Sequence, residues 1–127
     1  IRIGLAPYGA CAAKHTSLRC PLKPVMALHS HVVAIQLINK SDSVGYNHQY
    51  VAKSATKIAI AAIGYGNGYP QSAPNGTMVS INNKLYSIAD RVSMELMAID
   101  IGYAPEINIG DSVTLFGSGN LLVDNVA

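Results

Sequence analysis

The chain is organised around the stretch Ile58-Ala59-Ile60-Ala61-Ala62-Ile63-Gly64-Tyr65-Gly66-Asn67-Gly68-Tyr69-Pro70. An apolar run leads directly into a glycine-rich turn that carries two tyrosines. Glycine permits positive φ angles and lets a ligand or another chain approach the backbone closely. A tyrosine held on such a turn, as Tyr65 is, can donate or accept a proton. Taken alone, the stretch favours the plainer interpretation, a strand followed by an ordinary surface turn.

Short apolar runs alternate with turn residues along the rest of the chain. We expect strands at residues 1–9, 25–38, 57–65, 78–81, 85–88, 92–101 and 112–116, and a short strand pair within 46–51. Asn82-Asn83 predicts a two-residue hairpin turn, because asparagine tolerates positive φ. No segment keeps a helical period between two caps. The pattern therefore predicts an all-β fold, either a barrel or a sandwich.

Length and composition limit the classes of protein to which the chain can belong. Its 127 residues are the size of one domain, half of them are hydrophobic, and only 13% are charged. Such sparse charge suggests that some apolar surface meets another domain or subunit. The formal charge is +2 and basic residues do not cluster, so neither nucleic acid nor an anionic membrane is expected as a partner. No apolar run approaches the roughly 20 residues needed to cross a bilayer.

Several residues with reactive or ligating side chains have plainer explanations. Cys11 and Cys20 are expected to be two thiols rather than a disulfide. His29 and His31 lie two apart on an expected strand, so both side chains should share one face. No third ligand is spaced to complete a metal site, and a polar strand face is the favoured interpretation. Arg91 can clamp a carboxylate, but taken alone it indicates only a surface cation.

Six segments resemble motifs of the alanine racemases, in the same order along the chain. They are Arg2-Ile3-Gly4-Leu5-Ala6-Pro7-Tyr8-Gly9, Leu22-Lys23-Pro24-Val25-Met26, Asp42-Ser43-Val44-Gly45-Tyr46, Ile63-Gly64-Tyr65-Gly66-Asn67-Gly68-Tyr69-Pro70, Ile81-Asn82-Asn83 through Arg91-Val92-Ser93-Met94-Glu95, and Ile109-Gly110-Asp111-Ser112-Val113. The fourth resembles I-G-Y-A-D-G-Y-P and the fifth resembles I-N-G…G-R-V-S-M-D. Each motif is weak alone, but six in register span nearly the whole chain.

The resemblance implies a fragment of a larger bacterial, cytoplasmic enzyme. In that family an N-terminal (β/α)8 barrel holds pyridoxal 5'-phosphate on a lysine, and a mostly β domain follows. Residues 1–23 would be the end of the barrel, with its last strand at 1–9, and residues 24–127 would be the C-terminal β-barrel domain, truncated at its end. The chain begins without methionine, which fits a missing beginning. The family forms head-to-tail homodimers in which each β domain completes the partner's active site.

The resemblance also assigns roles in the interconversion of L-alanine and D-alanine for peptidoglycan. Tyr65 would be the catalytic acid/base that acts on the face opposite the cofactor lysine. Met94 would donate a backbone N–H to the substrate carboxylate, and Arg91 would line the entrance. On the cofactor side, Arg2 would face the pyridine nitrogen, and backbone amides near Gly4 and Leu5 would contact the phosphate.

The sequence departs from the family motifs at Gly66-Asn67, Asn82-Asn83, Asp90 and Glu95. These departures affect loop geometry and charge at the entrance, but not Tyr65 itself. They leave two alternatives open: a non-catalytic β-barrel module for binding or assembly, and a related racemase that acts on another amino acid. The 127 residues alone are expected to be inactive, because the lysine-bearing barrel is absent.

Overall fold

The computed structural model describes residues 2, 4, 6–9, 23–46, 48–104, 106–118 and 121. Its elements are η1 (Ala6–Tyr8), β1 (Leu28–Ile38), β2 (Ser43–Val44), β3 (Tyr50–Val51), β4 (Thr56–Ala61), η2 (Tyr65–Asn67), β5 (Met78–Ile81), β6 (Lys84–Ile88), β7 (Met97–Gly102) and β8 (Ser112–Phe116). Within these residues, no helix is long and apolar enough to span a membrane.

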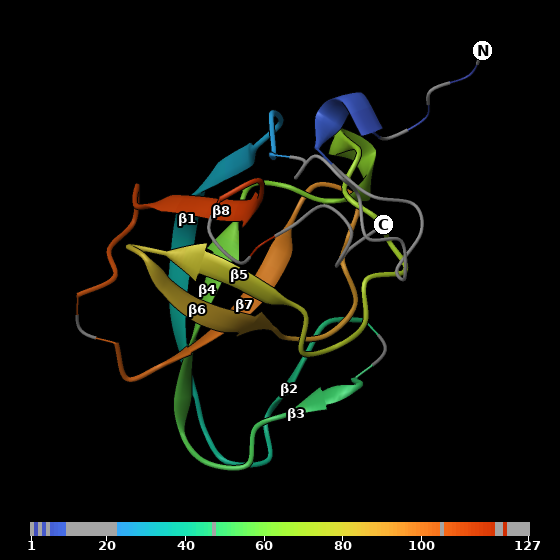
Figure 1. Ribbon diagram of the computed structural model, residues 1–127. Helices are drawn as coiled ribbons and strands as arrows, with labels where there is room; N and C mark the ends of the chain where they lie inside the picture. Colours follow the sequence, from blue (N-terminus) through green and yellow to red (C-terminus); the bar gives the residue numbers. More distant parts are fainter. Residues whose placement is uncertain are drawn as a thin grey trace.

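Six antiparallel strands close into a barrel in the order β1-β4-β7-β6-β5-β8 (Figure 1). The eleven-residue strand β1 closes it, because its first half pairs with β8 and its second half pairs with β4. Strands β2 and β3 form a separate two-stranded sheet. The all-β prediction is therefore confirmed, and closure into a barrel leaves no exposed strand edge in the main sheet.

The barrel interior is filled by alternate residues of its strands. Strand β7 shows this most clearly, since Met97, Ile99 and Ile101 are buried and the residues between them are half-buried. Burial of each such side chain stabilises the fold by about 1.5–3 kcal/mol. His29 and His31 share the exposed outer face of β1, as predicted. The core is therefore mainly aliphatic, with Tyr69 and Phe116 as its aromatic members.

Two predicted strands are shorter than expected because the chain turns to form loop contacts. Strand β4 ends at Ala61 rather than at residue 65, and Tyr65 begins a 3-10 turn. Strand β7 begins at Met97 rather than at residue 92, because the Ser93 N–H donates to the Leu96 carbonyl (3.1 Å) and closes a tight turn. Both apolar runs continue beyond the sheet because their residues pack at one end of the barrel instead.

The N-terminal strand prediction is wrong in the residues that the structure describes there. Ala6–Tyr8 is a 3-10 helix, and the ring of Pro7 suits its φ angle. The pair expected within 46–51 is also shifted, since its first strand is Ser43–Val44. By contrast, the Asn82-Asn83 hairpin is confirmed, with φ angles of 50° and 64°. Cys11 and Cys20 lie outside the described residues.

Asp100 of β7 joins the small β2–β3 sheet to the barrel. Its carboxylate accepts hydrogen bonds from Tyr50 Oη, from Thr56 Oγ1 (2.7 Å) and from the Gly102 N–H (3.0 Å). Burial acts to raise the pKa of Asp100, but these three hydrogen bonds lower it overall below 3.8. Burial, followed by the hydrogen bond to Asp100 and its charge, raises the pKa of Tyr50 to about 12. Asp100 is therefore ionised at neutral pH and holds Tyr50 as a donor.

Replacing Asp100 with asparagine should destabilise the fold by about 2 kcal/mol. Tyr50 and Thr56 donate to different carboxylate oxygens, and in asparagine one of these oxygens is replaced by an NH2 group that cannot accept. The folded-state pKa of Asp100 is lowered, so its stabilising effect is complete above pH 3.8 and is lost as the pH falls through the lowered value. Urea unfolding at pH 7 and at about pH 3 should show a difference between wild type and Asp100→Asn that shrinks in acid. Glu95→Gln, which removes an exposed carboxylate that makes no ion pair among the described residues, is the control. A difference that is equal at both pH values would contradict this account.

Candidate active-site pocket

The turn that carries Tyr65 is shaped by its own backbone and by Asn67. Asn67 Oδ1 accepts from the Gly64 N–H (3.1 Å), and the Asn67 N–H donates to the Gly64 carbonyl (3.1 Å). Gly68, at φ 95°, ends the turn in a left-handed conformation that favours glycine. The family motif has aspartate at the place of Asn67. The amide oxygen of asparagine supplies the acceptor that an aspartate would provide, so this departure leaves the turn intact.

The tyrosine turn docks on residues 93–94 through the backbone. The Tyr65 N–H donates to the Ser93 carbonyl (3.0 Å), and the Gly66 N–H donates to the Met94 carbonyl (2.8 Å). A Cβ atom on Gly64 would lie 2.1 Å from the Ser93 carbonyl oxygen, and one on Gly66 would lie 2.9 Å from that of Met94. Glycine is needed at residue 64 because the two backbones are too close for any side chain.

Tyr69 anchors the same turn in the barrel core. Its side chain is 1% exposed, and it belongs to the core cluster with Ile63 and Val92. Burial raises the pKa of Tyr69 to about 12, which keeps the phenol neutral. Tyr65, four residues earlier, is 40% exposed. One tyrosine of the turn therefore fixes its position, and the other presents a hydroxyl to solvent.

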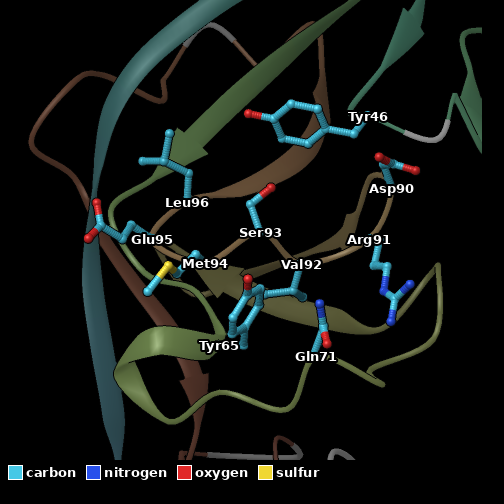
Figure 2. A pocket seen from close by; sticks show the side chains of 10 residues that line it. All are labelled: Tyr46, Tyr65, Gln71, Asp90, Arg91, Val92, Ser93, Met94, Glu95 and Leu96. Carbon is cyan, nitrogen blue, oxygen red and sulfur yellow. The ribbon is translucent and has the colours of Figure 1, made fainter.

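Tyr65 lines a pocket of about 690 Å³, which is shown in Figure 2. Three of the predicted site residues, Tyr65, Arg91 and Met94, line this pocket together. Arg91 and Met94 come from the loop between β6 and β7, so this loop and the loop after β4 bring the three residues together. The Met94 N–H donates no hydrogen bond to another described residue, and it remains available to an acceptor.

The described residues expected on the cofactor side are not among those that line this pocket. Arg2 is exposed, Gly4 has φ 67° with open space around it, and neither lines the pocket. Leu5 lies outside the described residues. Among the residues that the structure describes, no three histidines, cysteines or carboxylates gather at a metal-binding spacing.

Sequence reasoning assigned no role to several residues of the pocket wall, among them Tyr46 and Asp90. Tyr46 is 93% exposed and reaches the pocket from the loop between β2 and β3. Asp90 appeared in the sequence only as a departure from the family motif, yet it is 3% exposed and at φ 65°. An exposed tyrosine beside Gly45 in a turn was the available signal for Tyr46. For Asp90 the only signal was the replacement of glycine by a charged residue.

The closed barrel with a loop-lined pocket at one end is a domain type found in one enzyme family. Residues 25–127 match the family described as "Alanine racemase, C-terminal domain". The chain belongs to this family, which confirms the resemblance drawn from the motifs. It is 39% identical to the alanine racemase of Vibrio vulnificus over all 127 residues, which are 34% of that protein. The alanine racemase of Nitrosomonas eutropha is 38% identical over the whole chain, which spans 35% of that relative.

Solved structures agree with this family assignment. The biosynthetic alanine racemase of Pseudomonas aeruginosa superposes with a TM-score of 0.88 at 36% identity, over 98% of this chain and 35% of that one. The alanine racemase of Acinetobacter baumannii gives a TM-score of 0.86 at 37% identity, with the same coverage. The chain thus spans about a third of the length of the relatives that it matches.

Replacing Gly64 with alanine should separate the two loops, because the added methyl group would overlap the Ser93 carbonyl. We expect a loss of about 2–3 kcal/mol in unfolding free energy, typical of overpacking against a backbone that must move. Chemical denaturation of wild type, Gly64→Ala and the exposed control Asn75→Ala measures this loss. Equal stability of all three proteins would show that the loops do not depend on this contact.

Proposed function

We infer that this chain is the C-terminal part of an alanine racemase that interconverts L-alanine and D-alanine. The observation that carries the inference is the exposed Tyr65 hydroxyl, held on a backbone-fixed turn beside Arg91 and Met94 in one pocket. The family relationship supports the same reaction. An alanine racemase relative from Bacillus anthracis, 32% identical over 98% of this chain, was solved with L-Ala-P bound. D-Alanine made in this way would serve peptidoglycan synthesis.

Racemisation needs a proton to leave one face of the α-carbon and another proton to arrive on the opposite face. Tyr65 would hold the proton at one face, with its phenol oxygen as the acid/base. The free Met94 N–H would bind the substrate carboxylate and orient the α-carbon toward that oxygen. Arg91, exposed at the edge of the pocket, would attract the anionic carboxylate at the entrance. The second base would lie on the part of the protein that precedes this chain.

The expected cofactor is pyridoxal 5'-phosphate, which when bound acidifies the α-proton by withdrawing electrons. Two described residues fit such a group. The exposed Arg2 would offer its guanidinium to the ring nitrogen, and the open space at Gly4 would leave room for the phosphate. Leu5 would add a backbone amide. Arg2 stays charged, so it would not transfer a proton to the ring nitrogen.

The pocket wall includes largely exposed side chains such as Tyr46 and Met94, which suits completion by another part of the protein. Residues 1–23 would end the N-terminal barrel and residues 24–127 would form the β domain. A head-to-tail homodimer would bring Tyr65 to the partner's cofactor. Exposed apolar side chains on the outer face of β1, Val33 and Leu37, support a covering surface in the full-length protein. The enzyme would act in the cytoplasm.

Replacing Tyr65 with phenylalanine in the full-length protein should lower kcat by about 10²–10⁴-fold in at least one direction, because the phenol proton is lost. Racemisation of L-alanine and of D-alanine, with pyridoxal phosphate added, measures both directions. Tyr69→Phe is the matched control, since it makes the same change in the same turn. Its hydroxyl is buried without a partner among the described residues, so its removal should cost little.

Unchanged rates in both directions for Tyr65→Phe would refute the role of Tyr65. Cofactor-loaded wild type that racemises another amino acid, but not alanine, would favour the related racemase. A full-length protein that binds no pyridoxal phosphate and racemises nothing would favour a non-catalytic β-barrel module.

A further inference from the structure

The pocket wall contains a buried carboxylate that the proposed reaction does not use. Asp90 is 3% exposed, and its Oδ1 atom has no hydrogen-bond partner among the described residues. Its backbone is left-handed, at φ 65°, a region that aspartate tolerates better than most residues but glycine best. Burying a charge without a partner is strongly unfavourable. An unpaired carboxylate oxygen at a pocket therefore indicates that its donor lies outside the described residues.

Asp90 cannot easily turn away from this position. The loop that carries it is held at one end by the Ala89 N–H, which donates to the Ala98 carbonyl (2.8 Å). On its other side, Gly45 packs directly against the carboxylate, because a Cβ at residue 45 would lie 1.5 Å from Asp90 Oδ2. Gly45 at φ 82° precedes Tyr46, which also lines the pocket. The backbone of Gly45 thus packs against Oδ2, whereas Oδ1 has no hydrogen-bond partner among the described residues.

No cation in the described part of the chain neutralises this carboxylate. The ion pair found there joins Lys84 to Glu106 (2.8 Å), on exposed side chains outside the pocket. Arg91, the next residue, is exposed, and in Figure 2 its side chain extends away from Asp90. Glu95, the other carboxylate of the pocket, lies across it from Asp90 in Figure 2. On the side of Asp90, the pocket therefore presents a carboxylate without a described cation and favours the binding of a positively charged group.

We propose that Asp90 is a binding site for an ammonium or guanidinium group that enters the pocket from outside the described residues. The cation has two sources. It is either a lysine or arginine of the polypeptide that covers the pocket, or the side-chain cation of a basic amino acid substrate. The second source rests on the proposed function and extends its substrate class to amino acids such as lysine and ornithine. The first source does not depend on the reaction.

Whether Asp90 variants have a raised or a lowered thermal midpoint tests the first source, a cation of the protein itself. In the full-length protein, Asp90→Asn keeps the size of the side chain and removes its charge, and Asp90→Gly also suits the left-handed backbone. If Asp90 is unpaired, both changes should raise the thermal midpoint, because they remove a buried charge. If a cation of the protein pairs with it, both should lower the midpoint by about 2–4 °C or more, because that cation loses its partner. Glu95→Gln is the control, since it removes the same charge from an exposed side chain in the same pocket.

The ratio of kcat/KM for L-lysine to that for L-alanine tests the second source. Asp90→Asn and Asp90→Gly should lower this ratio by about tenfold or more if Asp90 binds the side-chain ammonium group. Glu95→Gln should change it far less. The ratio isolates recognition of the side chain, because any effect on the common chemistry divides out.

Lowered midpoints in both variants would establish a cation of the protein as the partner. Midpoints that are unchanged or raised, with a lowered lysine ratio, would establish the substrate. Midpoints that are unchanged or raised, with an unchanged lysine ratio or with no racemisation of lysine by the wild type, would overturn the proposal. If the wild type racemises no amino acid, the proposed racemase function is refuted. In that case the thermal midpoints alone decide whether Asp90 binds a cation.

Discussion

Two backbone hydrogen bonds hold the whole candidate site in place. They join the tyrosine turn to the 93–94 backbone at a separation that excludes any side chain on Gly64. Backbone contacts of this kind are rigid, because neither partner can change rotamer. The position of Tyr65 relative to Met94 is therefore set by the chain itself. In the proposed reaction, an acid/base that acts on a single α-carbon would benefit from such a fixed position.

The barrel supports this contact by anchoring both loops in its core. Tyr69 and Ile63 come from one loop and Val92 from the other, and all three belong to the same buried cluster. The closed barrel order places β4 and β6 on either side of β7, so the loops that follow β4 and β6 emerge close to each other. The small β2–β3 sheet, tied to the barrel through Asp100, then brings Tyr46 to the rim of the pocket. Rigid strands thus support loops that carry the chemistry.

Most strands could be predicted from the sequence, because alternation and turn chemistry are local. The hairpin at Asn82-Asn83 and strand β8 were found in this way. The predicted strand ends were wrong where an apolar residue of a loop packs into the core. Ile63 and Val92 look like strand residues in the sequence, but they cap the barrel end. Residues 6–8 failed for another reason, since short 3-10 turns leave no periodic signal.

The sequence by itself determined the fold class, the family and the identity of Tyr65 as the candidate acid/base, because six motifs and the strand pattern are written in consecutive residues. Only the tertiary structure decided which of two tyrosines in one turn is buried and which is exposed. It alone also revealed Asp90 as a buried carboxylate against Gly45, forty-five residues away in the chain. The burial and hydrogen bonding of a residue depend on contacts with residues distant in the sequence, and a local sequence pattern does not reveal these contacts.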